Sequence, residues 1–352
     1  MFGFGKNSRS IIGLDVGARR IKAVQLDASS GSLCAAVVVP RIEASLAPTP
    51  DEVARLSATL YRAGFMGTRI ALAMPSEKLI TQVMEFPRAA GSFEQLARME
   101  LARSHRCSPD SLELGAWELP SANRAGKSTQ VMVIACKHED STPLLDLFEQ
   151  QGMDVVSLQP RACALARATA QFTANEKSMS AILDFGWNAA TLVLVHQGIV
   201  FYERKITEGG LGHLHRELCQ RLNIDSAVAD YVLEDVGLEQ SANQTAPPEA
   251  RDVLVAHLES LISELLASFE YSSHQFGDSA PSQLLVIGGG AAVPGFVELL
   301  AIQSGIPSKA IAPPDLLQCP PLRTQAFCSP LLLPALGLAM DQSVAAKKSD
   351  AA

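Results

Sequence analysis

The chain has 352 residues, of which 47% are hydrophobic and 19% are charged. This composition excludes a disordered chain, because disordered segments have few apolar side chains, and the length predicts two domains with a large core. The sequence holds 29 basic and 37 acidic residues, for a net charge of −8. An acidic balance with no run of basic residues argues against a nucleic-acid-binding protein.

The cysteines and the apolar stretches indicate the compartment. The seven cysteines are scattered and form no Cys-x-x-Cys pair, which argues against a zinc or disulfide framework and fits a reducing environment. The longest apolar stretch, Leu331 to Met340, is about half the length of the roughly 20 residues that a membrane span needs. The first ten residues lack the apolar core of a signal peptide. We therefore expect a cytoplasmic protein that reaches a membrane only through a partner.

The first part of the chain is predicted to be β-rich. Residues 10–26 have the pattern of a strand, a turn and a returning strand, and another β-rich run follows at 34–39. Thr49 and Asp51 are candidate caps of a helix with an early proline, which we expect to reach about Ala63.

A small α+β module is predicted between residues 69 and 152, inserted into a larger fold. Strands are predicted at 69–74, 78–86, 112–119 and 130–136, and helices at 93–105 and 142–151. The polar residues 120–129 are expected to form the loop between the last two strands.

The second half of the chain begins with another strand–turn–strand pattern at Ala181. Helices are then predicted at 211–222, 226–233 and 251–276, followed by a buried strand at 284–287 that ends in three glycines. The residues from Asp341 onward are predicted to be disordered.

The two strand–turn–strand units are similar to each other and lie half a chain length apart. Their sequences are IIGLDVGARRIKAVQL and AILDFGWNAATLVLV. Each is an apolar strand that ends in Asp-x-Gly, followed by a tight turn and a returning strand. Repetition at this distance predicts a duplicated fold with a cleft between two like halves.

Asp15 and Asp184 end the two apolar strands and are candidates for holding a metal ion. The glycine two residues later lets backbone N–H groups approach a ligand closely, so each turn can hold phosphate. Two such turns facing each other can bind a polyphosphate from both sides, with the two carboxylates holding Mg²⁺ through water. A single Asp-x-Gly is typical of any surface turn, and it is the matched pair that favours the phosphate site.

Two further features fit this site. Lys22 lies on the strand that returns from the first turn, where it is either a point charge on phosphate or a solvated strand residue. Gly288, Gly289 and Gly290 follow a buried strand and permit close approach of a base or sugar to the backbone. We interpret these glycines as the nucleoside end of the site.

Taken in order, these motifs resemble the actin-like ATPase superfamily and, within it, the PilM branch of type IV pilus assembly proteins, relatives of the cell-division protein FtsA. The resemblance covers about residues 2–340. It rests on two phosphate motifs, part of the inserted module, an adenosine motif and a last helix: IIGLDVGARRIKAVQL, AILDFGWNAATLVLVHQGIVFYERKITEGG, RIALAMPSEKLITQVMEFPRA, LLVIGGGAAVPGFVELL and SPLLLPALGLAM. It implies an α/β fold of the actin-like ATPase type, with two ribonuclease-H-like domains around a nucleotide cleft and an inserted small α+β subdomain.

The resemblance divides the chain into six segments. They are the first half of domain I (1–68), the inserted, partner-binding subdomain (69–155), the connecting helix (156–180), domain II with the adenosine motif (181–328), a C-terminal helix that returns to domain I (329–340) and a disordered tail (341–352). The apolar stretch from Leu331 is thereby expected to pack inside the protein.

The resemblance also implies ATP and Mg²⁺ in the cleft and assigns residues to each part of the site. The first phosphate loop would comprise Asp15, Gly17, Ala18, Arg19 and Lys22, and the second Asp184, Gly186, Asn188 and Thr191, followed by Gly209 and Gly210. Asp15 and Asp184 would hold Mg²⁺ through water, and the three glycines from Gly288 would contact the adenosine. Gln159 lies on the connecting segment, where the superfamily places the residue that orients the attacking water.

This chain departs from the family pattern after the first Asp-x-Gly. It has Ala18-Arg19-Arg20 where the family usually has Ser or Thr, so position 18 lacks a hydroxyl for the phosphate. Backbone N–H groups and an arginine can still hold the phosphate. Gln159 can position water but cannot act as a general base, because its side chain is not ionisable. We therefore expect ATP binding with slow hydrolysis or none.

The resemblance further implies a cytoplasmic scaffold at the inner face of the inner membrane, in a pilus, competence or related secretion machine. The expected partner is the cytoplasmic N-terminal segment of a PilN-like inner-membrane protein. Its apolar anchors would lie in a groove between the first domain and the inserted subdomain. Self-association is left open, and no nucleic-acid partner is expected.

Two alternative functions remain possible from the sequence. A sugar or carboxylate kinase of the same superfamily needs a catalytic Asp and substrate-binding polar residues, but residues 27–68 hold no recognisable phosphoryl-acceptor motif. An FtsA-like cell-division protein needs a C-terminal amphipathic membrane helix, and the tail DQSVAAKKSDAA has no apolar face.

Overall fold

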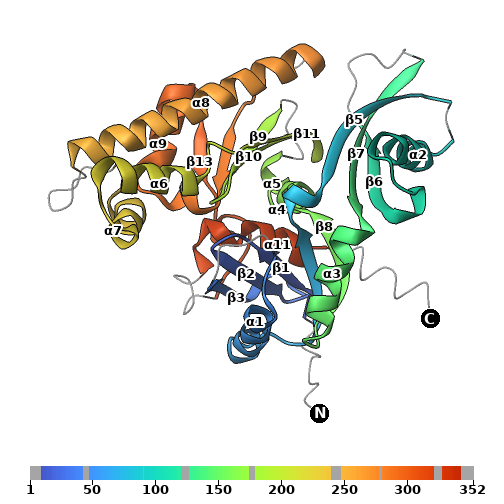
Figure 1. Cartoon of the computed structure of the whole chain (residues 1–352), viewed down its shortest axis with the longest axis horizontal. Coiled ribbons are helices and arrows are strands. Elements are labelled where there is room, and N and C mark those ends of the chain that lie inside the picture. The colour runs from blue at the N-terminus through green and yellow to red at the C-terminus, as the bar shows by residue number, and fades with distance from the viewer. Residues whose placement is uncertain are drawn as a thin grey trace.

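The protein is built around two five-stranded sheets, with a smaller three-stranded sheet beside them (Figure 1). The computed structural model describes residues 9–42, 47–89, 91–119, 127–173, 179–238, 247–276, 280–320 and 327–341. The tail expected to be disordered lies outside these residues except for Asp341, as does most of the polar loop expected at 120–129. Within the described ranges, no helix combines the length and the apolar character that crossing a membrane requires.

The two large sheets have the same strand order. The first sheet has the order β3 (Leu33–Pro40), β2 (Arg20–Leu26), β1 (Ile12–Val16), β4 (Arg69–Met74) and β8 (Asp154–Pro160). The second has the order β11 (Ile199–Ile206), β10 (Ala190–His196), β9 (Ser180–Phe185), β12 (Leu284–Ile287) and β13 (Ser308–Ala310). In each sheet the first three strands are antiparallel and the other two are parallel to the central one. The predicted duplication is confirmed.

The central strands β1 and β9 place the two predicted aspartates at equivalent positions. Both strands are buried almost throughout, which explains their continuous apolar sequence. Asp15 lies opposite Lys22 on β2, and Asp184 lies opposite Thr191 on β10. Because each strand also pairs in parallel with a neighbour, both carboxylates lie at the carboxyl edge of a sheet, where ligands of open α/β sheets bind.

The inserted module forms its own sheet. Its strands have the order β5 (Ile80–Pro87), β7 (Ser128–Lys137) and β6 (Leu112–Glu118), and α2 (Phe93–His105) packs against them. Figure 1 shows this module as a separate lobe at the upper right. Strand β4, expected in the module, pairs with β1 in the first sheet. The elements that share the small sheet therefore run from Ile80 to Lys137, inside the expected 69–155.

Most of the expected helices form close to their expected positions. In the first half these are α1 (Pro50–Arg62), α3 (His138–Glu149), α4 (Arg161–Ala168) and α5 (Ala170–Thr173). In the second half they are α6 (Leu211–Leu222), α7 (Ser226–Tyr231), α8 (Pro248–Phe276), α9 (Phe296–Ser304) and α11 (Leu333–Ala339). Of the two candidate caps, Thr49 is the one that caps α1, and it forms a capping box with Glu52 that was not predicted. The helix expected at 226–233 instead becomes a π-helix from Val232 to Val236.

The last helix, α11, packs against α4 and against strands β1 and β2 of the first sheet. The contact is close because two glycines lie in it. A Cβ atom on Gly337 would lie 1.9 Å from the carbonyl oxygen of Ala164, and one on Gly13 would lie 1.9 Å from that of Ala335. These helices belong to an apolar cluster that also includes residues of β2, β9 and β12. One core therefore joins the two halves.

Candidate functional site

A cavity of about 360 Å³ lies between the two large sheets. It is lined by the β1–β2 turn, the β9–β10 turn, the segment after β12 and the first residue of α4. The cavity brings together most of the predicted site residues: Asp15, Gly17, Ala18, Arg19, Lys22, Asp184, Gly186, Asn188, Thr191, Gly288 and Gly289. Two sequence segments half a chain apart thus meet in one site.

Asp15 and Lys22 form a buried ion pair at the base of the cavity. The Lys22 Nζ atom donates to Asp15 Oδ2 at 2.6 Å, and both side chains are almost fully buried. Their pairing follows from the antiparallel register of β1 and β2, which sets the two residues directly opposite each other. Of the two interpretations of Lys22, the structure excludes the solvated strand residue. The ammonium group lies in the cavity wall.

Arg161 links the two halves of the site. Its guanidinium group donates to Asp15 Oδ1 at 2.6 Å and to Asp184 Oδ2 at 3.1 Å. Burial alone would raise the pKa of Asp15, but the charges of Arg161 and Lys22 outweigh burial and hold that pKa below its ordinary value. Arg161 was not among the predicted site residues. The available signal was an arginine at the first position of a helix, where the helix dipole disfavours a cation unless carboxylates compensate it.

The two aspartates do not fit the predicted magnesium site. Both oxygens of Asp15 and one oxygen of Asp184 accept hydrogen bonds from cationic side chains. A metal ion held through water would need these oxygens as acceptors for its water ligands. The ion would have to compete for them with Lys22 and Arg161, which already donate to three of the four carboxylate oxygens.

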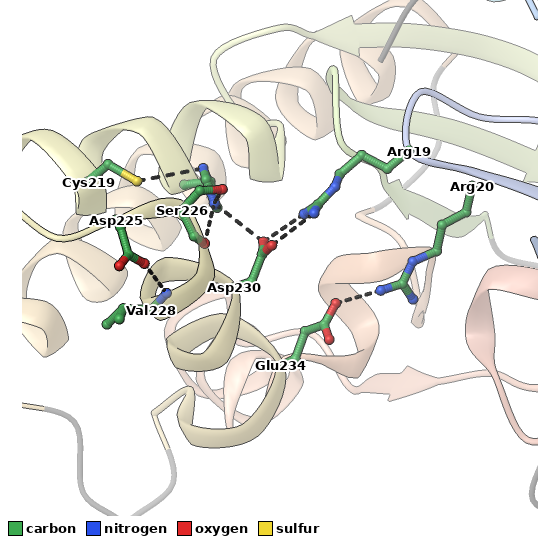
Figure 2. A network of polar contacts seen from close by, with 9 residues as sticks. Arg19, Arg20, Cys219, Asp225, Ser226, Val228, Asp230 and Glu234 are labelled. Atoms are coloured by element: carbon green, nitrogen blue, oxygen red, sulfur yellow. Dashed lines mark hydrogen bonds and ion pairs between the residues drawn. The ribbon is translucent and has the colours of Figure 1, made fainter. Parts of the chain in front are cut away.

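Arg19 in the β1–β2 turn and Arg20 at the start of β2 point toward Asp230 and Glu234 (Figure 2), and all four residues line the cavity. Arg19 donates two hydrogen bonds to Asp230 on α7, at 2.7 and 2.9 Å, and its guanidinium lies 4.3 Å from the centre of the Trp187 ring. Arg20 contacts Glu234 on the π-helix at 2.5 Å. The hydrogen bond from Arg19 holds the pKa of Asp230 below its ordinary value. We call these two ion pairs the clasp.

The charges that line the cavity balance one another. As many carboxylates as cations line it, and each is paired with a charge of the opposite sign: Asp15 and Asp184 with Lys22 and Arg161, Glu77 with Lys205, Asp230 with Arg19, and Glu234 with Arg20. Sequence analysis did not identify Arg161, Glu77, Lys205, Asp230 or Glu234. Their partners are distant in sequence, so no local pattern marked them.

Four predicted site residues do not line the cavity: Gln159, Gly209, Gly210 and Gly290. The Gln159 side chain contacts Ser157, Arg167 and Asp341. Gly290 is required by packing, because a Cβ atom there would lie 2.1 Å from the Phe185 ring. Gly288 does line the cavity, and its φ of +81° is accessible mainly to glycine.

Solved structures share this fold over nearly their whole length. A PilM-PilN type IV pilus biogenesis complex matches with a TM-score of 0.79 and 22% identity, over 94% of this chain and 98% of that chain. The ethanolamine utilization protein EutJ from Carboxydothermus hydrogenoformans matches with a TM-score of 0.53 and 16% identity, over 94% of this chain and 89% of that one. MreB 5 of Spiroplasma citri bound to AMPPNP matches with a TM-score of 0.54 and 12% identity, over 99% of both chains. These likenesses confirm the actin-like ATPase fold.

The family comparison is more specific than the fold. No curated protein matches the chain. The model of the family described as type IV pilus assembly protein PilM matches residues 13–343. The chain therefore belongs to the PilM family of type IV pilus assembly proteins.

Proposed function

We propose that this chain is a nucleotide-binding scaffold of type IV pilus assembly. The observation that carries the proposal is the cavity between two matching Asp-x-Gly turns, with a glycine-lined segment at one side. The likeness to MreB 5, whose structures hold AMPPNP and ADP, supports a nucleotide as the ligand. Membership of the PilM family favours this function over a sugar kinase or an FtsA-like division protein.

In this proposal the turns and their cations hold the phosphates. Backbone N–H groups of residues 18–19 and 187–188, with Lys22 and Arg161, would face the phosphate groups, whereas those of Gly17 and Gly186 donate to carbonyl oxygens within the turns. Gly288 and Gly289 leave room for the nucleoside. Every carboxylate that lines the cavity, within the described part of the chain, is paired with a cation and is a poor general base. We therefore propose binding with slow hydrolysis or none.

The nucleotide site is tested by filling the cavity. Ala292 is exposed and lines the cavity, so Ala292→Trp places an indole in it without disturbing the core. We expect ATP affinity to fall by about tenfold or more, since the ring excludes part of the ligand. Isothermal calorimetry measures the change. Ala54→Trp, at an exposed position on α1, is the matched control and should bind ATP like the unmodified chain.

We further propose that the inserted module binds a PilN-like peptide; the related PilM protein forms a complex with PilN, which supports a partner of this kind. The module has a groove lined by β5, by α2 and by the segment after α2, which lies within the module and not between the module and the first domain, where the groove was expected. Leu96 and Met99 of α2 line it and are 40% and 61% exposed. Apolar side chains on an exposed helix face suit the anchors of a short peptide. Through this partner the chain would be held at the inner membrane.

The peptide site is tested by a charge in the groove. Met99→Glu places a carboxylate among the apolar side chains, and we expect the affinity for a PilN-like N-terminal peptide to fall by about tenfold or more. Ile302→Glu is the matched control, because Ile302 is 77% exposed on α9, far from the groove in sequence. Fluorescence anisotropy with a labelled peptide gives both affinities. Equal affinities for the two variants would rule out this groove.

A further inference from the structure

Arg161 lies where the sequence predicted a metal ion. Its Nη2 atom donates to Asp15 Oδ1 at 2.6 Å, and its Nη1 atom donates to Asp184 Oδ2 at 3.1 Å. Lys22 donates to the other oxygen of Asp15 at 2.6 Å. One carboxylate from each half of the molecule is thus held by a cation that belongs to the chain itself.

The arrangement places a permanent charge against the ligand space. Asp15 and Asp184 are buried, whereas the Arg161 side chain is 29% exposed and lines the cavity. A guanidinium stays charged at every pH that proteins tolerate, and its planar fork of N–H donors suits two acceptors at once. A magnesium ion at this position would have to compete with the guanidinium for the oxygens that Arg161 holds on both aspartates.

We infer that nucleotide binding in this cavity does not depend on a divalent cation, because the Arg161 guanidinium supplies the positive charge between the two aspartates. The inference rests on the proposed nucleotide site and replaces the predicted Mg²⁺ between Asp15 and Asp184.

The direct test measures ATP binding to the full chain by calorimetry, once with Mg²⁺ and once with EDTA. We expect the dissociation constant for ATP in EDTA to be at most about threefold larger than in Mg²⁺. Binding that weakens by about tenfold or more in EDTA would overturn the inference but leave the nucleotide site standing. Absence of binding in both buffers would instead overturn the proposed function.

Variants of Arg161 test the guanidinium itself. In Arg161→Gln the charge is lost, and we expect ATP affinity in EDTA to fall by about tenfold to a hundredfold, the size of a charge-assisted hydrogen bond. Added Mg²⁺ should restore part of this affinity, because the two aspartates are then free of the guanidinium. Unchanged binding of Arg161→Gln in EDTA would contradict the inference.

Two further variants guard against misfolding. Arg161→Lys keeps a charge at the position and should retain binding in EDTA better than Arg161→Gln does. Arg62→Gln removes an exposed arginine of α1 and should bind ATP like the unmodified chain. If Arg161→Lys binds no better than Arg161→Gln while both melt near the temperature of the unmodified chain, a charge at this position is not what holds the nucleotide.

Discussion

Glu203 lies in surroundings that disfavour the charged form of its side chain. It lies on β11, and its Oε2 atom is buried without a hydrogen-bond partner. Burial raises the pKa of Glu203 above its ordinary value, although the charge of Arg161 opposes the shift. Burial also raises the pKa of the Cys163 thiol, to about 11, and the charge of Glu203 adds to that shift. Both groups therefore favour their neutral forms.

This environment predicts that Glu203→Gln stabilises the protein at neutral pH. The unfolded chain ionises this carboxyl near its ordinary pKa of 4.5, whereas the folded chain retains the proton to higher pH. The folded state therefore loses stability as the pH rises above 4.5, and a neutral glutamine removes the loss.

Urea denaturation near neutral pH and again near the ordinary pKa of a carboxyl group measures this effect. The stabilisation should shrink at the lower pH, where the Glu203 carboxyl of the folded chain retains its proton and is neutral, as glutamine is. Glu118→Gln, at an exposed position on β6, is the control and should change stability little at either pH. A Glu203→Gln variant that is less stable than the unmodified chain near neutral pH would contradict the assignment.

The two aspartates at the strand ends could be predicted from the sequence, but the side chains that pair with the site residues could not. Asp15 and Asp184 were recognisable because the Asp-x-Gly pattern is local and repeated. Arg161 was not, because its contact with Asp15 joins residues 146 positions apart. The same limit applies to Arg19, which was expected at phosphate and pairs with Asp230, 211 positions away.

At the scale of elements, the clasp joins the β1–β2 turn to α7 and the π-helix that follows it (Figure 2). The turn of a β-hairpin and a helix terminus are held together by side chains that are partly exposed. Exposed ion pairs contribute roughly 0.2–1 kcal/mol each. A nucleotide phosphate entering the cavity would compete for the same arginines.

The clasp predicts that nucleotide affinity rises when its carboxylates are neutralised. In the double variant Asp230→Asn, Glu234→Gln, Arg19 and Arg20 lose their ionic partners and can turn to phosphate. We expect ATP to bind about 1.5- to 5-fold tighter, the equivalent of one exposed ion pair. Calorimetry measures the gain. Glu100→Gln, which breaks an exposed pair with Arg103 on α2, is the control; an equal gain there, or weaker binding by the double variant, would count against the clasp.

Local sequence patterns predicted which helices and strands form better than they predicted where each one ends. The cap at Thr49 and the amphipathic spacing of 93–105 each depend on residues of one element, so both could be predicted from the sequence. The π-helix was not expected, since the apolar side chains of 226–233 also suit a continued α-helix. Its wider turn includes Glu234, one member of the clasp.

At the scale of the whole molecule, a shared core holds the two halves together. Residues of β2, β9 and β12 meet α4 and α11 in one apolar cluster. The repeated strand–turn–strand pattern predicted two like halves. It did not predict that β4 belongs to the first sheet, because membership of a sheet depends on pairing with β1, far away in sequence.

This core predicts that Gly337→Ala destabilises the whole protein. The added methyl would lie 1.9 Å from the carbonyl oxygen of Ala164, so α11 must move away from α4. Overpacking of this kind costs about 1–3 kcal/mol, measured as the loss in free energy of unfolding in urea. Gly115→Ala is the control, because a Cβ atom there meets no atom within 4 Å. Equal stability of the two variants would show that the helices can separate at no cost.

The position of α11 also determines when the first sheet can finish folding during synthesis. Strand β1 leaves the ribosome early, but the helix that covers it comes from the far end of the chain. At a synthesis rate of about 5–20 residues per second, β1 waits roughly 15–65 s for that cover. Until then its apolar face around Gly13 is open to chaperones and to other nascent chains. The first half of the molecule is thus the last to be completed.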